Sequence, residues 1–309
     1  MKGRTTLLTI VTFLILIIMA TACAAAGGSV LPPQERLKVA TTSSLYDTGF
    51  WSFLEPKFEQ KYNVALDIIY ANTGIAIQYG QRGDVDALTI HDKAREEQFV
   101  SDGYGVKRNP FAYNYFLIVG PADDPAGIKG LTPEAAFKDL MEEGLKNPTQ
   151  IRFVSRGDGS GTHSKEQAIW KAAGFNYTAG VEGSSWAKAG AEGGYMEAGK
   201  GMGPTLLMAS EKKAYTLTDE GTFLAYKGEL NLVPLVETTL GQVNILLNVY
   251  SVIAVNPEKF PKANVKMAQN LVDFFLSPEG QKLVGSYGVK DYDKSLFIPC
   301  AGNEPQAQP

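Results

Sequence analysis

The sequence predicts an α/β protein of about two domains. Short apolar runs typical of strands alternate with segments of helical spacing from residue 37 onward. The length of 309 residues suits two domains, and a turn-rich stretch at 121–130, "PADDPAGIKG", separates two such alternating sets. The rhythm of strand and helix favours mainly parallel sheets.

The elements follow from local patterns. Trp51, Leu54, Phe58 and Tyr62 fall on one face of a helix that we expect over 47–62. Further helices are expected from Gly74, over 133–146, after residue 164, from near Gly203 and over 262–287. The start near Gly203 is expected because Pro204 suits a first helical turn. The expected strands are 37–41, 64–70, 86–90, 115–120, 151–154, 214–218, 232–236 and 252–256.

The N-terminus has the pattern of an export signal. Lys2 and Arg4 precede an apolar run that ends in small residues before Cys23, which predicts a signal peptide over 1–22. The placement of Cys23 resembles that of the lipidated cysteine of bacterial lipoproteins. Residues 23–36 then form a tether, and 302–309 a loose tail. With Cys23 lipidated, Cys300 has no disulfide partner.

Composition excludes several classes of protein. The formal net charge is −4 and there is no basic tract, so we expect no nucleic-acid partner. The acidic groups at 123–124 and in "DKAREE" (92–97) are interpreted as solvated charges, so no cation site and no cofactor are expected.

Four loops share a design that suits an anion. In each, a strand ends and glycines or hydroxyl residues open a helix, whose N-terminus carries about half a positive charge and unpaired N–H groups. Taken one at a time, such loops also match ordinary helix capping. They are "TTSS" (41–44), "NTG" (72–74), "RGDGSGTHS" (156–164) and "GKGMGPT" (199–205).

The loop "SRGDGSGTHS" (155–164) needs more than capping to explain it. Arg156 is the only permanent cation in this loop, and its planar fork of donors suits the oxygens of an anion. Asp158 would repel an anion, so we expect it to hold Arg156 or a loop N–H instead.

Enzymatic interpretations of this loop are weaker. A secreted serine hydrolase using Ser160 stays open as an alternative, but Asp158 stands where a nucleophile elbow needs glycine. Only His91 and His163 exist, and we expect His163 to cap or pack. The Gly-Lys-Ser/Thr ending of a P-loop is absent, and "GKGMG" is no dinucleotide fingerprint.

The chain resembles the tungstate-binding solute receptors of ABC importers. "ATTSSLYDTGFW" (40–51) is similar to their Thr-Thr-Thr-Ser loop, and "SRGDGSGTH" (155–163) to their Arg-Gly-Asp-x-Ser-Gly-Thr-His signature. Residues 202–227 and 252–260 also resemble stretches of the family, and the likeness runs from about Leu37 to Pro299.

The resemblance implies a type II periplasmic-binding-protein fold, in which two hinge-linked lobes close over the ligand. Lobe one is expected at 37–120 plus 245–301, and lobe two at 121–244. The implied oxyanion donors are Thr42, Ser43, Arg156, Ser160 and Thr162, to which the same loops add Thr73, Gly161 and Gly203. Ser43 stands where the family usually has threonine, and "NVYSVIAVNP" departs from the family's entry to that strand, which leaves the contacts of residues 248–251 open.

The implied function is capture of tungstate, with molybdate as a second ligand, by an exported monomer. Its partners would be a membrane permease and the cytosolic ATPase of an ABC importer. Such a dianion offers no protons near neutral pH, so donors alone should surround it, without a carboxylate. A phosphate or sulfate receptor on the same fold is the nearest alternative.

Overall fold

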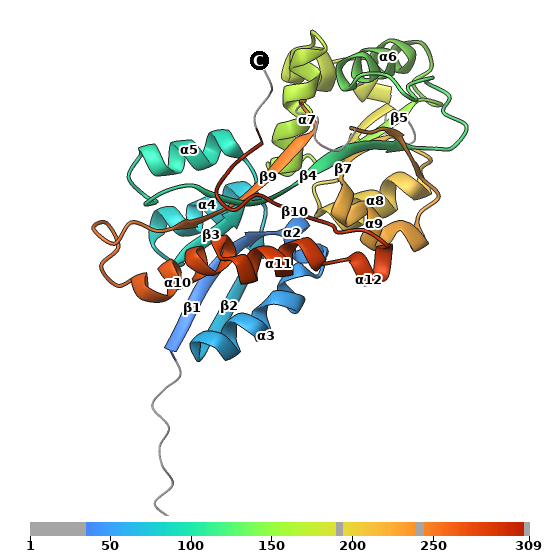
Figure 1. Cartoon of the computed structure of the whole chain (residues 1–309). Coiled ribbons are helices and arrows are strands. Elements are labelled where there is room, and N and C mark those ends of the chain that lie inside the picture. Colours follow the sequence, from blue (N-terminus) through green and yellow to red (C-terminus); the bar gives the residue numbers. More distant parts are fainter. Residues whose placement is uncertain (1–34, 190–193, 239–243, 306–309) are drawn as a thin grey trace, which may run out of the picture. The chain divides into compact units, whose positions relative to one another are not determined.

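The computed structural model describes residues 35–189, 194–238 and 244–305 (Figure 1). The expected signal peptide (1–22), Cys23, most of the tether and residues 306–309 lie outside the described residues. Within the described part, no helix combines the length and the apolar character needed to cross a membrane.

The first half of the chain alternates strands and helices, as expected. Two details differ from the sequence prediction. The helix expected over 47–62 begins at Phe50, after a separate short helix at 43–47, and a charged helix follows β3. The elements are β1 (Glu35–Thr42), α2 (Ser43–Asp47), α3 (Phe50–Tyr62), β2 (Val64–Ala71), α4 (Thr73–Arg82), β3 (Ala87–Ile90), α5 (Lys93–Ser101) and β4 (Asn109–Gly120).

The second half begins with a helix whose bounds the sequence predicts. Thr132 accepts a hydrogen bond from the Ala135 amide and Pro133 follows it, so α6 starts where a cap and a pre-set φ angle coincide. The elements up to β8 are α6 (Pro133–Lys146), β5 (Arg152–Ser155), α7 (Gly161–Ala172), η1 (Tyr177–Glu182), η2 (Ala187–Ala189), β6 (Gly194–Glu197), α8 (Met202–Glu211), β7 (Thr216–Asp219), α9 (Glu220–Tyr226), η3 (Lys227–Glu229) and β8 (Val233–Val236). The chain then returns through β9 (Leu247–Ala254), α10 (Val265–Leu276), α11 (Pro278–Ser286), α12 (Val289–Tyr292) and β10 (Ile298–Pro299).

The strand β4 pairs with two groups of strands. Its first part, Asn109–Tyr115, pairs with β9, and its last residues pair with β7 and β8 (Figure 1). The path through the large sheet is β10-β4-β9-β3-β1-β2, and β5 and β6 form a separate parallel pair. One continuous strand therefore joins the sheet of the N-terminal elements to the strands of the central part of the chain.

The expectation of mainly parallel sheets is wrong. The pair β1–β3 is parallel, but β4 and β9 are antiparallel to each other, and β9 is also antiparallel to β3. The reason is that β9 enters the sheet from the distant second half of the chain, whereas the rhythm of strand and helix reports only on connections between neighbours in sequence.

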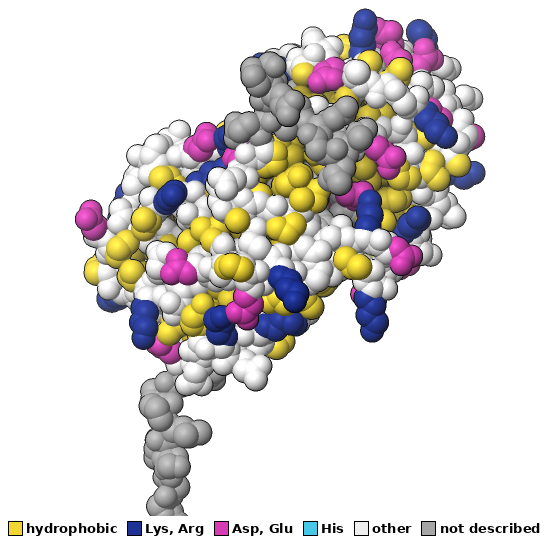
Figure 2. All heavy atoms as spheres, viewed as in Figure 1, with side chains coloured by type: hydrophobic (Ala, Val, Ile, Leu, Met, Phe, Trp, Pro, Cys, Tyr) yellow, Lys and Arg dark blue, Asp and Glu magenta, His cyan; other side chains and the backbone are white. Residues whose placement is uncertain are grey.

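Separate apolar clusters support the two regions. One packs α3 and α10 against the sheet and includes Trp51, Phe58, Leu271 and Phe275. Another packs α6 and α7 against β5 and β6, around Phe137, Phe153, Trp170 and Trp186. On the face drawn in Figure 2, basic and acidic side chains are interspersed.

Parts of the expected tether and of the expected loose tail belong to the folded body. Residues 35–36 of the expected tether belong to β1. At the other end, Glu304 of the expected loose tail forms ion pairs with Lys93 and Arg108, so the described part of the tail, up to residue 305, is bound to the body.

Candidate oxyanion-binding site

The predicted loops lie at the N-terminal ends of helices. Thr42 caps α2, Thr73 is the first residue of α4, Ser160 caps α7 and Gly203 lies in the first turn of α8. A hydrogen bond joins the N-terminal ends of α4 and α7, and another joins the loop 41–44 to the loop 156–160. These contacts bring together residues that are far apart in sequence.

Arg156 connects the separate loops. It is 2% exposed, and its Nη2 donates to Ser43 Oγ at 3.1 Å. Its Nε donates to the carbonyl oxygen of Lys200 at 3.3 Å, in the loop that precedes α8. Burying a guanidinium costs free energy unless it is paired and hydrogen-bonded, so these contacts are needed to keep Arg156 in this position.

Asp158 behaves as the sequence predicts. One carboxylate oxygen accepts from Arg156 Nη2 at 2.5 Å, and the other accepts from the Ser160 amide at 3.1 Å. Both oxygens are therefore occupied by donors of the same loop.

Capping and anion binding are compatible in the loops 41–44 and 156–164. The hydroxyl oxygen of Ser160 accepts from the His163 amide at 3.1 Å, and that of Thr42 accepts from the Leu45 amide at 3.3 Å. Each cap uses an oxygen lone pair, so the hydroxyl hydrogen is still able to donate elsewhere.

The hydroxyl of Thr162 is one of four buried side-chain polar groups that lack a hydrogen-bond partner within the described chain, and the one that lies in the anion loop. The residue is 1% exposed, and its Oγ1 makes no hydrogen bond to any described residue. A buried hydroxyl without a partner costs free energy, and in native proteins it calls for an explanation such as a bound ligand.

Thr73 and Gly161 meet directly. The Gly161 amide at the start of α7 donates to Thr73 Oγ1 at the start of α4, at 2.9 Å. A Cβ on Gly161 would lie 3.0 Å from both the ring and the carbonyl oxygen of His91, so this approach tolerates a larger residue poorly.

Gly203, in the first turn of α8, lies close to Asp47 and Tyr226. The backbone of Gly203 lowers the pKa of Asp47, while burial of that carboxyl raises it more strongly. A Cβ on Gly203 would lie 2.3 Å from the ring of Tyr226, so only glycine fits here. The Asp47 carboxylate therefore lies at the start of α8, where a helix terminus favours negative charge.

The expectation of a space without carboxylates is not met by the pocket beside these loops. A pocket of about 350 Å³ is lined by Ser43, Tyr70, Lys200 and the two acids Asp47 and Asp158. Because Asp158 is already paired with Arg156, Asp47 is the acid that the sequence reasoning missed. Its contact partners lie more than 100 residues away, and no local pattern reports such a contact.

His91 was also missed, and it lies close to the TTSS loop. Its Nδ1 is 2.9 Å from Asn248 Oδ1, and its Nε2 is 2.8 Å from Ser44 Oγ. Because the amide nitrogen of Asn248 donates to Asn114 and Tyr250, its oxygen accepts from His91 Nδ1–H. Burial lowers the pKa of His91 to about 4, so the ring is neutral at pH 7.

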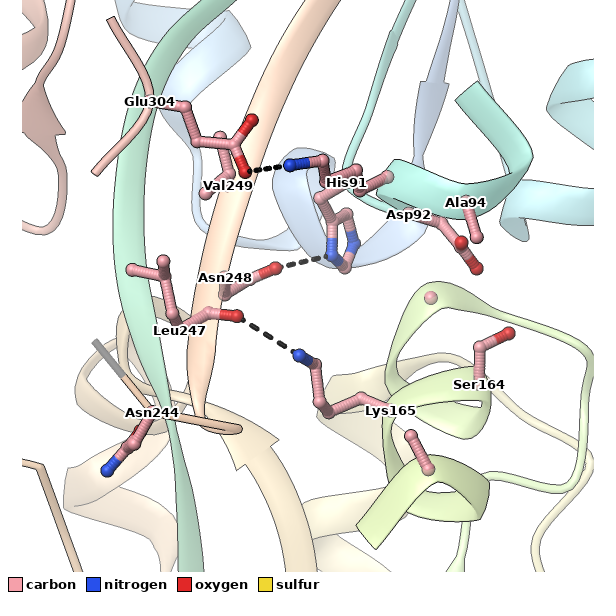
Figure 3. Close-up of a pocket in the computed structure, with 13 residues that line it drawn as sticks. His91, Asp92, Ala94, Ser164, Lys165, Asn244, Leu247, Asn248, Val249 and Glu304 are labelled. Carbon is pink, nitrogen blue, oxygen red and sulfur yellow. Dashed lines mark hydrogen bonds and ion pairs between the residues drawn. The ribbon is translucent and has the colours of Figure 1, made fainter. Parts of the chain in front are cut away.

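Of residues 248–251, whose contacts the sequence left open, Asn248 therefore holds the His91 ring. A second pocket, of about 390 Å³, lies beside them and is lined by His91, Asn248, Gly161 and Lys165 (Figure 3). Lys165 Nζ donates to the carbonyl oxygen of Leu247 at 3.2 Å across this pocket.

The interpretation of "DKAREE" as solvated charges holds for Lys93 and Glu97 but is wrong for Glu96. Glu96 is 0% exposed and accepts from Arg108 Nε at 2.5 Å, and burial raises its pKa to about 7. Arg95, in the same helix α5, donates to Gly159 O and Ser164 Oγ of the anion loop. The segment has few apolar residues, so no local pattern indicates that Glu96 is buried.

The geometry gives no support to hydrolysis by Ser160. Its hydroxyl accepts from the His163 main chain, while His163 Nδ1 accepts from the Gly159 amide and Nε2 contacts Tyr177. Among the described residues, neither histidine ring is hydrogen-bonded to Ser160, so it lacks a general base. The described residues also contain no group of three metal-binding side chains.

Known proteins match nearly the whole described chain. A family model described as the PBP superfamily domain covers residues 25–279. The tungstate-binding protein TupA of Peptoclostridium acidaminophilum is 38% identical over 85% of this chain and 85% of its own length.

Two solved structures agree. The tungstate ABC transporter structure from Geobacter sulfurreducens is 44% identical, covering 82% of this chain and 99% of that one, with a TM-score of 0.69. TupA from Desulfovibrio alaskensis G20 is 37% identical over 86% of this chain and 98% of its own, also with a TM-score of 0.69. The protein is thus a two-lobed α/β member of the PBP superfamily, and it belongs to the family of these tungstate-binding proteins.

Proposed function

We propose that this protein is an extracytoplasmic receptor that binds tungstate, and molybdate as a second ligand, for uptake by an ABC importer. Its partners are then a membrane permease and the cytosolic ATPase that drives it. The relatives named for tungstate binding, matched over more than four-fifths of this chain, support the assignment.

The observation that carries the proposal is the buried Thr162 hydroxyl, which has no partner among the described residues and lies in the same loop as Arg156. A tetrahedral dianion has four oxygens that accept hydrogen bonds and, near neutral pH, no proton to donate. Arg156, the Thr162 hydroxyl and the hydrogens of the capping hydroxyls of Thr42 and Ser160 are donors of the kind it needs. Ser43, Thr73, Gly161 and Gly203 complete the proposed ligand-binding set.

Two lobes would enclose the anion. We assign 37–120 and 245–301 to lobe one and 121–244 to lobe two, with β4 and β9 as the hinge strands. The pairing of β4 with strands of both regions, and the separate apolar clusters, support this division. Donors from both lobes that engage one anion would drive closure.

Export, anchoring and oligomeric state belong to the same proposal. The N-terminal pattern supports cleavage after residue 22 and lipidation of Cys23, which would tether the receptor to the outer face of the cytoplasmic membrane. We expect a monomer. Mass spectrometry of the N-terminal peptide from membranes tests the lipid, and light scattering tests the mass in solution.

Calorimetric titration with tungstate, molybdate, sulfate and phosphate tests the ligand. We expect tungstate to bind more tightly than sulfate or phosphate, and Arg156→Ala to weaken it strongly, because the change removes charge-assisted donors. Arg82→Ala is the matched control, since Arg82 is exposed and its guanidinium contacts Asp84 and the Tyr79 ring, both outside the proposed ligand-binding set. Tighter binding of phosphate or sulfate would refute the assignment and identify a receptor for that anion.

A further inference from the structure

Arg95 joins helix α5 to the anion loop. Its Nη1 donates to the carbonyl oxygen of Gly159 at 2.9 Å, and its Nη2 donates to Ser164 Oγ at 2.8 Å. These partners lie 64 and 69 residues further along the chain, one within the loop and one in the first turn of α7. A single guanidinium thus holds both the loop and the helix that the loop opens.

Contacts within α5 also orient the guanidinium of Arg95. Asp92, the residue that caps α5, accepts from Arg95 Nε at 2.6 Å and from the Arg95 amide at 3.3 Å. The side chain of Arg95 is 31% exposed, so it lies at an edge and is only partly screened by solvent. Figure 3 shows Asp92 and Ser164 on segments that face each other. The fixed fork of arginine suits such a bridge, whereas a lysine ammonium is a point donor.

The loop 156–164 needs a partner such as Arg95 because its glycines allow more than one backbone conformation. Gly157 and Gly159 have φ values of +58° and +70°, a region that glycine enters at little cost. Neighbouring peptide groups can rotate there, and a carbonyl oxygen turned toward an anion would repel it. Arg95 holds the Gly159 carbonyl toward α5, while the Gly159 amide donates to His163 Nδ1 at 3.1 Å.

A second contact lies beside the first. The Gly161 amide donates to Thr73 Oγ1, and a Cβ on Gly74 would lie 3.5 Å from Arg95 Nη1. The N-terminal ends of α4 and α5 therefore both hold the start of α7. Neither contact uses Arg156 or the Thr162 hydroxyl, so both persist while those groups bind a ligand.

We propose that Arg95 is a positioning residue that latches the loop 156–164 to α5, keeps the Gly159 carbonyl away from the bound oxyanion, and slows release of that anion. The inference rests on the proposed function for its ligand, but the latch is a property of the chain itself. Arg95 acts through Gly159 and Ser164 and does not touch the anion.

The dissociation rate of tungstate is the first measurement, made by stopped-flow fluorescence on the purified full chain. Arg95→Ala should raise this rate about tenfold, because two charge-assisted hydrogen bonds are lost, with the association rate changed less than about twofold. Ser164→Ala should have a smaller effect. The double variant should dissociate no faster than Arg95→Ala alone, since both changes act on one latch.

Two further variants separate the latch from simple charge. Arg95→Lys keeps the positive charge but cannot bridge Gly159 and Ser164 together, so it should stay close to Arg95→Ala. Arg82→Ala removes a positive charge from the neighbouring helix α4 and should behave as wild type. Full rescue by lysine, or a loss carried by the association rate alone, would reduce Arg95 to a source of electrostatic attraction and overturn the proposal.

Hydrogen exchange without ligand provides an independent measurement. Arg95→Ala should speed exchange in the peptide 156–164, with little change at α10, which serves as the internal reference. Unchanged exchange in this peptide would refute the latch, whatever the ligand is. Absence of tungstate binding to the wild type would instead refute the proposed function, and the exchange result would still decide the role of Arg95.

Discussion

The Gly161 amide and the Thr73 hydroxyl meet at 2.9 Å and join the first residues of two helices that are 88 positions apart in sequence. Both residues are buried. The contact gives the start of α7 one of the partners that helix termini lack, and it links two of the glycine- and hydroxyl-rich loops that the sequence predicts as anion binders.

Thr73→Val tests this contact. The variant keeps the shape of the side chain but removes the acceptor, so the Gly161 amide is left buried and unpaired. We expect the free energy of unfolding to fall by about 1–3 kcal/mol, measured by chemical denaturation. Thr73→Ser, which keeps the hydroxyl, should lose much less. Equal losses in both variants would show that the methyl group rather than the hydrogen bond is responsible.

Thr162→Val should have opposite effects on stability and on binding. Its hydroxyl is buried without a partner among the described residues, so replacing it by a methyl group should raise the free energy of unfolding by about 1 kcal/mol in the absence of ligand. The same change should weaken tungstate binding about tenfold, because a donor to the anion is lost. Denaturation and calorimetry on one preparation measure both quantities.

The control for Thr162 is the serine variant. Thr162→Ser retains the hydroxyl, so its tungstate affinity should remain close to that of the wild type. If Thr162→Val bound tungstate as tightly as the wild type, the hydroxyl would face away from the ligand and its lack of a partner would need another cause.

Arg156→Lys separates charge from geometry. Lysine keeps the positive charge, but its single ammonium cannot reproduce the planar set of contacts to Ser43, Asp158 and the Lys200 carbonyl. We expect tungstate affinity to fall by about tenfold or more, measured by calorimetry. Affinity equal to the wild type would mean that the charge alone matters and that the fork does not orient the loop.

Local patterns allowed most elements to be predicted, and α6 is the clearest case. Thr132, Pro133 and the periodic apolar residues after them fix its start without help from distant contacts. Helix α5 shows the opposite. Its charged residues indicate solvent exposure, yet Glu96 is buried because Arg108, which lies beyond the helix, pairs with it. Burial of a charge depends on a partner that a local pattern does not reveal.

The candidate site divides in the same way. The density of glycine and hydroxyl residues around Arg156 marks the loop, and the pairing of Asp158 follows from the sign of its charge. Asp47 and Arg95 remained hidden, because their importance arises only when α8 and α7 approach them across the fold. Whether a long-range partner exists is decided by topology, here by the antiparallel return of β9 beside β4.

The pH dependence of stability tests the neutral state of His91. Burial lowers its pKa from an ordinary 6.5 to about 4 in the folded protein; Arg156 and Arg95 lower it further, while Asn248 and Asp92 oppose the shift. Between these values the unfolded chain binds a proton at His91 and the folded chain does not, so stability is fully present above pH 6.5 and is lost as the pH falls toward 4. The buried carboxyls Glu96 and Glu166, whose pKa values are raised to about 7, change stability in the opposite direction over this range.

His91→Gln isolates the contribution of the histidine, because both carboxyls are present in the wild type and in the variant and cancel in the difference. We expect the stability of the wild type relative to His91→Gln to drop by about 3 kcal/mol between pH 6.5 and 4. Urea denaturation across this pH range measures it. Parallel curves for the two proteins would show that His91 takes up a proton as readily in the folded protein as in the unfolded chain, and that its ring is not held neutral by burial beside the TTSS loop.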